Sequence, residues 1–164
     1  MKTVNISIAV ILFFGFIFCN MAPAIAQQSK VKKEAMVKDL ITSRQYIFFA
    51  QSVTPMSGRQ RFLTGDNTLS VAKDTVISDL PYFGRAYSAP MNTSEGGIKF
   101  TSLNFDYLVS DRKKGGWNIT IKPKDKQDVQ LLILNVFVDG TASLQVTSNN
   151  RQPIQFNGYI SGKK

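Results

Sequence analysis

Aromatic and basic side chains alternate in the segment that begins at Tyr82, and this pattern is the one in the chain best suited to ligand binding. Tyr82, Arg85 and Tyr87 lie within six residues. Aromatic rings can stack on bases or sugars, and a guanidinium adds charge or a cation–π contact. Aromatic residues at strand spacing more often fill a core, as we expect for Phe83 and Trp117. A phenol and a guanidinium are harder to bury, so Tyr82, Arg85 and Tyr87 are predicted as the ligand-binding residues.

Side chains suited to catalysis are scarce. The sequence contains no histidine, and its one cysteine is Cys19. Cys–His and Ser–His catalysis, and zinc sites with the usual ligands, are therefore excluded within these residues. The acids nearest the aromatic segment are Glu95, Asp106 and Asp111, and their spacing does not define the facing pair that a carboxylate-based hydrolase needs. We expect no catalytic residue, no metal site and no cofactor, and a carboxylate-based hydrolase remains an alternative.

The chain is basic. It has 20 lysines and arginines against 11 acids, a formal net charge of +9. Such a surface attracts polyanions, anionic lipid headgroups or acidic glycans. The basic residues are scattered, however, and no block of them resembles a nucleic-acid-binding arm. Nucleic acid is therefore not an expected partner, whereas a salt-sensitive polyanion or glycan binder remains an alternative.

The N-terminus has the pattern of a secretory signal peptide. Lys2 supplies a positive start, residues 4–19 are largely apolar, and Pro23 is expected to break the helix. Small residues then occupy the −3 and −1 positions of a cleavage site in Ala24-Ile25-Ala26. We therefore expect residues 1–26 to be removed and the mature chain to begin at Gln27, exported to the periplasm or the cell envelope.

Cys19 raises the alternative of a lipoprotein, in which this cysteine would be acylated after cleavage. The residue before an acylated cysteine is normally small, and here it is Phe18. Attachment to a membrane is expected only if Cys19 is lipidated. After cleavage at Ala26 the chain would contain no cysteine, so core packing alone would hold the domain together.

Helical periodicity extends from Ser29, a plausible N-cap, to about Arg44. Apolar residues recur on one face, and lysines with two acids fill the other. A helix lying on a membrane surface is an alternative, but the narrow apolar face without Trp or Phe favours packing on a sheet. The apolar residues are Met36, Val37, Leu40 and Ile41.

After Arg44 the sequence is typical of strands and turns. About nine short alternating segments are separated by Gly, Pro, Asn and Asp, and Asp139-Gly140 is the strongest hairpin signal. The expected fold is mainly β (α+β): one N-terminal helix followed by about nine antiparallel strands in a sandwich or barrel-like sheet. Neither a repeat nor a linker divides residues 27–164, which predicts a single domain.

Two segments predict local detail. The alternation changes parity at Thr101-Ser102, and a β-bulge there would return both apolar sets to one face. Residues 129–138 are apolar at both parities, which is typical of a central strand covered on both faces, with the N-terminal helix on one of them.

Four motifs of the chain are typical of a known family. They are Leu80-Pro81-Tyr82-Phe83-Gly84-Arg85-Ala86, Gly96-Gly97-Ile98-Lys99-Phe100, Lys114-Gly115-Gly116-Trp117 and Ser148-Asn149-Asn150-Arg151-Gln152-Pro153-Ile154. Through them the chain resembles the bacterial domain-of-unknown-function family numbered 4251. The resemblance covers nearly all of the expected mature chain and implies an exported, envelope location without supplying an activity, ligand or catalytic residue. Many members resemble lipoproteins at their N-termini, a pattern from which this chain departs at Phe18.

Taken together, these patterns favour an exported, non-catalytic β-rich domain that binds an envelope ligand or a partner protein. The polyanion or glycan binder and the carboxylate-based hydrolase are the alternatives.

Overall fold

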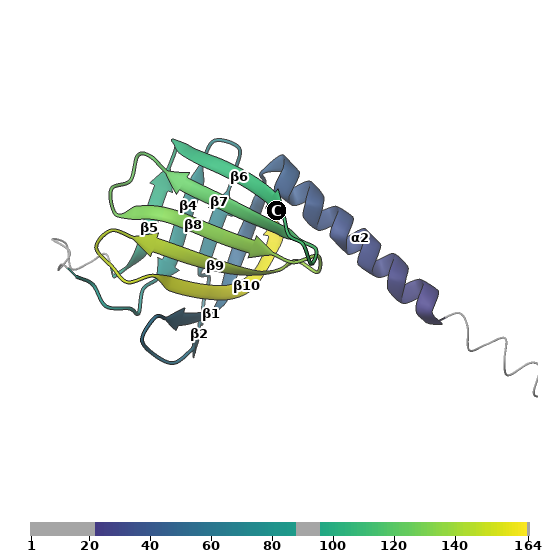
Figure 1. Cartoon of the computed structure of the whole chain (residues 1–164), viewed down its shortest axis with the longest axis horizontal. Helices are drawn as coiled ribbons and strands as arrows, with labels where there is room; N and C mark the ends of the chain where they lie inside the picture. The colour runs from purple at the N-terminus through teal and green to yellow at the C-terminus, as the bar shows by residue number, and fades with distance from the viewer. Residues whose placement is uncertain (1–21, 88–95, 164) are drawn as a thin grey trace, which may run out of the picture.

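The structure, a computed structural model, describes residues 22–87 and 96–163. In these residues one helix precedes ten strands, which confirms the expected mainly β fold with one strand more than predicted (Figure 1). The elements are α2 (Ala22–Ser43), β1 (Tyr46–Pro55), β2 (Arg61–Phe62), β3 (Thr68–Val71), β4 (Val76–Pro81), β5 (Gly97–Ser102), β6 (Phe105–Asp111), β7 (Trp117–Pro123), β8 (Val129–Val136), β9 (Thr141–Ser148) and β10 (Ile154–Gly162).

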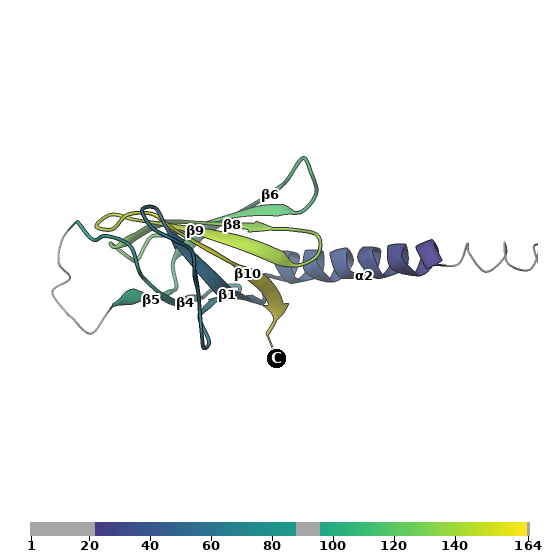
Figure 2. The ribbon, with the colours of Figure 1, turned by 90° about the horizontal axis from the view of Figure 1, so that it is seen from below.

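The strands form one antiparallel sheet that curls into a nearly closed barrel. Its order is β5-β4-β3-β1-β10-β9-β8-β7-β6, and the short β2 pairs with β1. Figures 1 and 2 show two layers whose strands cross, with β1 and β10 joining them. The two end strands, β5 and β6, do not pair with each other among the described residues. The barrel is therefore open along one seam.

The core lies between the two layers and is built from the alternate, inward-facing residues of every long strand. β1 and β7 show the period of two most clearly, because buried and partly exposed residues alternate along most of each strand. The largest fully buried side chains include Tyr46, Phe48, Phe156, Leu69, Leu80, Ile119, Ile121, Leu132 and Leu134.

Helix α2 does not cover the sheet, so the prediction that it packs on one face is wrong. It extends away from the barrel, and only its C-terminal turns make contact (Figures 1 and 2). Val37 and Ile41 are 4% and 3% exposed, whereas Met36 is 66% exposed. The apolar stripe is too short to cover a sheet face, so it closes one end of the barrel instead.

The helix also begins earlier than expected. It starts at Ala22, so Ser29 lies inside it rather than at its N-cap. Pro23 does not break it, because proline is compatible with the first helical turn, where its missing N–H has no intrahelical partner. Most of the expected signal peptide, with Phe18 and Cys19, lies outside the described residues. No helix within the described ranges is long and apolar enough to cross a membrane.

Two predictions of local structure are wrong and one is confirmed. The parity change at Thr101-Ser102 is not a bulge: β5 ends at Ser102, the chain turns a corner, and β6 begins in the other layer. Ile98 and Phe100 on β5 and Phe105 and Tyr107 on β6 pack against the same core from opposite layers, whereas Leu103 and Val109 are exposed. Residues 129–138 are not covered on both faces, because β8 ends at Val136 and its outward side chains are partly exposed. The hairpin at Asp139-Gly140 is confirmed.

Candidate functional site

The structure places Tyr82 in a supporting role. Its hydroxyl lies 2.8 Å from the carbonyl oxygen of Arg85 and 3.0 Å from that of Gln152, and can donate to either. The Arg151 guanidinium lies over the ring, 5.2 Å from its centroid. Burial raises the pKa of the Tyr82 phenol. These contacts hold residues 82–85 against Arg151 and Gln152, so Tyr82 orients neighbouring residues rather than presenting its own hydroxyl.

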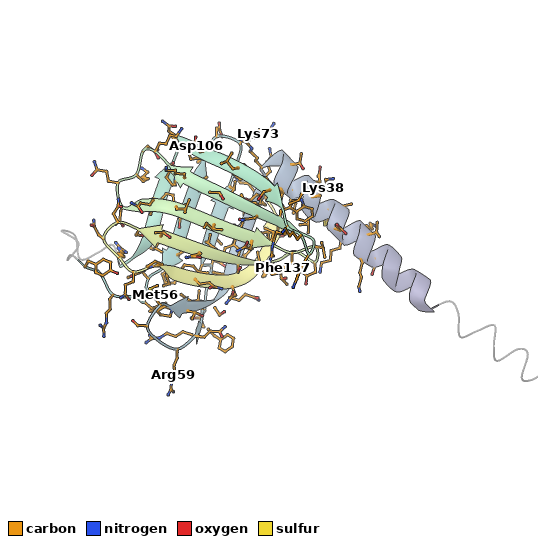
Figure 3. All side chains as sticks on the ribbon, viewed as in Figure 1. Lys38, Met56, Arg59, Lys73, Asp106 and Phe137 are labelled. Carbon is orange, nitrogen blue, oxygen red and sulfur yellow. The ribbon has the colours of Figure 1, made fainter. Side chains whose placement is uncertain are left out.

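Arg85 and Tyr87, in contrast, are exposed, with 69% of Tyr87 accessible. A second arginine joins them, since the Arg61 guanidinium lies 5.3 Å from the centroid of the Phe83 ring. Arg61 is the first residue of β2, in the connection between β1 and β3 that also carries Arg59 and projects from the barrel (Figure 3). We name Arg59, Arg61, Phe83, Arg85 and Tyr87 the arginine–aromatic surface. The sequence predicted two of these five residues, Arg85 and Tyr87. Phe83 was expected in the core but is 42% exposed, and Arg59 and Arg61 were not predicted because they lie more than 20 residues away in the sequence.

Trp117 belongs to a different site, a groove beside β6. We name it the edge groove, and it has a volume of about 540 Å³, within the usual range of ligand pockets. One wall comes from the C-terminal part of α2 and the residue that follows it, and the other from successive residues of β6. The lining residues are Lys38, Ile41, Thr42, Arg44, Tyr107, Leu108, Val109, Ser110, Asp111 and Trp117.

The edge groove exposes a strand edge with unused hydrogen-bonding groups. The N–H of Arg112 donates to the carbonyl of Gly116 at 3.0 Å, and hydrogen-bonded pairs alternate along an antiparallel ladder. Tyr107, Val109 and Asp111 therefore point their backbone groups away from β7. Among the described residues β6 pairs only with β7. Three N–H and three C=O groups consequently face the groove.

A tyrosine pair forms the inner end of the groove. The hydroxyls of Tyr46 and Tyr107 lie 3.2 Å apart, and the Arg44 guanidinium lies 4.7 Å from the centroid of the Tyr107 ring. Burial holds the pKa of Tyr46 well above its usual value, and the neighbouring Tyr107 raises it further. Burial also raises the pKa of Tyr107, although the hydrogen bond with Tyr46 and the charge of Arg44 oppose this. Either hydroxyl can donate the hydrogen bond of this pair.

The Tyr46 phenol should make the protein sensitive to alkali. Its folded pKa lies above its unfolded value of about 10. The stability it contributes is therefore complete below about pH 10 and is lost as pH rises toward the folded pKa. Tyr46→Phe should cost about 1 kcal/mol at neutral pH and flatten the fall in unfolding free energy above about pH 10. Urea denaturation from neutral pH to above about pH 10 measures both the loss of stability and its dependence on pH. If Tyr46→Phe left the alkaline slope of the unfolding free energy unchanged, the raised pKa of Tyr46 would be wrong.

Arg44 is held in a strained conformation. Its φ of 53° is the one positive value of a non-glycine residue in the described chain. It ends α2 in a Schellman motif, with Arg44 N–H donating to Ile41 and Gln45 N–H donating to Leu40, both at 3.2 Å. Glycine is usual at this position, and an arginine there costs about 1 kcal/mol. The strain places the guanidinium over Tyr107, inside the edge groove.

Two substitutions separate this strain from the side-chain contact. Arg44→Gly relieves the strain but loses a cation–π contact worth about 0.5–1 kcal/mol, so thermal unfolding should show stability unchanged or raised by up to about 1 kcal/mol. Arg44→Ala keeps the strain, loses the contact and should destabilise by up to about 1 kcal/mol. Equal destabilisation by both would show that Arg44 is not strained.

The acids near the groove do not converge. Asp106 pairs with Lys124 at 2.6 Å and lies at the end of β6 away from α2 (Figure 3). Asp111 lines the groove, five positions along the strand and therefore about 17 Å away, and Glu95 lies outside the described residues. In the parts of the chain that the structure describes, no three His, Cys, Asp or Glu side chains cluster as metal ligands. Asp106 and Asp111 therefore do not form the facing carboxylate pair that the alternative of a carboxylate-based hydrolase requires.

Little in the sequence indicates the edge groove. The parity of β6 placed Val109 with the core residues, yet Val109 is 43% exposed and Leu108 is 67% exposed. A weak signal was available, since two adjacent apolar residues followed by Ser110-Asp111 break the alternation. Such a break is compatible with an edge strand but does not identify one.

Fold and site together define a small antiparallel barrel with a projecting N-terminal helix and one open edge. The chain belongs to the family described as Domain of unknown function (DUF4251), which matches residues 28–160. It is also similar to the crystal structure of a DUF4251 family protein from Bacteroides eggerthii, with a TM-score of 0.61 and 16% identity over 83% of this chain and 91% of that chain. At this identity the likeness shows the fold alone. A comparison with curated proteins found no match.

Proposed function

We propose that the protein is an exported, non-catalytic binding domain that holds a partner protein of the cell envelope in the edge groove. The observation that carries this proposal is the open backbone edge at residues 107–111, beside Trp117 and facing Lys38 of α2 and Arg44, which follows the helix. Leu108 and Val109 add exposed apolar surface beside this edge. Exposed apolar residues with a polar rim are typical of protein-binding surfaces.

Export is part of the same proposal. The residues before Gln27 have the pattern of a signal peptide, and the family match begins at residue 28, directly after the expected cleavage site. The intact mass of the protein isolated from its natural host should correspond to residues 27–164. A mass that includes residues 1–26 would contradict cleavage, and a lipid-modified Cys19 would favour the lipoprotein alternative and attachment to a membrane.

Site-specific photocrosslinking tests the binding site in cells of the natural host. A photoreactive residue at Leu108 or Ser110 should give a discrete adduct with an envelope protein. The same residue at Ile77, which is 46% exposed on β4 in the other layer, is the matched control. Lys38→Glu should abolish the adduct without lowering thermal stability. Adducts of equal yield at all three positions, or none in the groove, would contradict the proposal.

The arginine–aromatic surface favours a second candidate function, binding of an acidic glycan or another polyanion. There the Arg61 guanidinium lies over the Phe83 ring, Arg59, Arg85 and Tyr87 are exposed, and residues 56–63 and 82–87 contain no acid. Binding of heparin, used as a probe, should weaken steeply with salt and fall when Arg61 and Arg85 are replaced by serine. Unchanged heparin binding by that variant would exclude this surface.

A further inference from the structure

We propose that the edge groove takes an acidic, extended peptide segment, which adds to β6 as a further strand of the sheet. This inference rests on the proposed function and specifies how the partner is held. Strand addition is a recurrent mode of peptide recognition, in which main-chain hydrogen bonds supply affinity and alternate side chains supply specificity.

The first argument is the geometry of the edge. The backbone groups of Tyr107, Val109 and Asp111 point away from β7, and the pairing of β6 with β7 runs without a register shift. The free groups therefore repeat about every 6.7 Å, as a partner strand requires. A strand added about 4.8 Å from β6 would lie in the groove between β6 and the end of α2.

The second argument is that the two end strands of the sheet differ in protection. Natural proteins block sheet edges with lysine, proline, bulges or covering groups. On β5, Lys99 lies 2.9 Å from Asp79, and Arg151 donates to the carbonyl of Gly97 at 2.8 Å. Residues 107–111 of β6 contain neither lysine nor proline, and no described strand other than β7 pairs with them. An unprotected edge is an aggregation hazard unless a partner uses it.

The third argument is charge, which selects the partner's chemistry. Lys38 and Arg44 line the groove against the single carboxylate of Asp111. The adjoining turn adds two exposed lysines, Lys113 and Lys114, whereas the Arg112 guanidinium lies over the Phe137 ring. The chain as a whole carries a net charge of +9. A segment rich in Asp and Glu is therefore attracted to this edge, whereas a second copy of this basic chain is repelled.

The fourth argument concerns side chains. Strand residues alternate between faces, so Val109 shares the side of Tyr107 toward α2, and Leu108 lies on the outer side. Both are exposed in the absence of a partner. An added strand would place cross-strand neighbours over each of them. Apolar residues between the acids of the segment are therefore expected.

Peptide selection provides the test. A displayed library of random 12-residue peptides, each about 40 Å long when extended, is screened for binding to the purified protein. The affinities of the recovered peptides are then measured at low and high salt. Recovered sequences should be enriched in Asp and Glu with interspersed apolar residues, and binding should weaken with salt. In hydrogen exchange, a bound peptide should slow the amides of Tyr107, Val109 and Asp111.

Backbone substitution makes the test specific. Val109→Pro removes an N–H that β7 does not use, and proline is tolerated on edge strands, so the fold should survive while peptide affinity falls by about tenfold or more. Val109→Ala is the matched control, because it trims the side chain but keeps the N–H, and it should retain most of the affinity. Asp111→Pro removes a second N–H that points away from β7, and it replaces Val109→Pro in the test if that variant does not fold.

The outcomes are distinguishable. If peptides bind and are lost with Lys38→Glu, yet tolerate both proline variants, the edge groove binds partners but strand addition is wrong. If no selected peptide binds in the groove, strand addition is wrong whatever the crosslinking shows. If the protein forms a dimer that Val109→Pro dissociates, the edge belongs to a second copy of the chain, and the peptide proposal is overturned.

Discussion

Replacing Gly158 with alanine is expected to destabilise the protein by about 3 kcal/mol or more. Gly158 lies on β10 opposite Ala50, where the pairing with β1 shifts register. A Cβ there would lie 1.8 Å from the backbone oxygen of Phe49, a separation that no side-chain rotation can relieve. Relief requires the two strands to separate at the junction of the two layers. Such a loss is a large part of the 5–15 kcal/mol typical of a domain.

Thermal or urea unfolding measures this effect, and a second glycine provides its control. A Cβ at Gly96 would meet no atom within 4 Å, so Gly96→Ala should change the free energy of unfolding by less than about 1 kcal/mol. If Gly158→Ala were as stable as Gly96→Ala, the close approach of β1 and β10 would be wrong, and with it the way the layers are joined.

Ile41→Ala is expected to cost about 2–4 kcal/mol. Ile41 is 3% exposed and lies at the end of α2 that docks on the barrel, so its removal leaves a cavity between helix and core. Because Ile41 also lines the edge groove, the substitution should loosen one wall of that groove. We expect peptide binding to weaken together with stability.

Met36 supplies the matched control on the same helix. It is 66% exposed, so Met36→Ala should change stability by less than about 0.5 kcal/mol. Comparable losses from both substitutions would mean that α2 packs over its whole length, as the sequence had suggested, rather than only through its last turns. No effect from either would mean that α2 does not dock at all.

The period-two pattern of the sequence predicted the fold class well, because it records which face of each strand is buried. The inward positions Ile119 and Ile121 and the hairpin at Asp139-Gly140 follow directly from local patterns of this kind. Strand order does not, because pairing joins residues far apart in the chain. The sequence therefore could not show that the parity change at Thr101-Ser102 is a corner between layers.

The candidate site was predictable only in part for the same reason. Arg85 and Tyr87 were chosen for their chemistry and are exposed, but whether they bind a ligand remains a prediction. Arg61 reaches Phe83 only because β2 pairs with β1. The edge groove exists because β6 is the end strand of the sheet and because α2 ends beside it. Neither property can be inferred from the residues of β6 alone.

Native-state amide hydrogen exchange of the free protein is the most direct test of the open edge. The amides of Leu108 and Ser110 on β6, and of Arg112 directly after it, point to the β7 side, as the bond from Arg112 to Gly116 indicates, and should exchange slowly. Those of Tyr107, Val109 and Asp111 should exchange faster by about tenfold or more. Alternating rates would support an edge free to receive a strand. Uniformly slow exchange at all six positions would show that the edge is already covered, and would contradict both the proposed site and the proposed mode of binding.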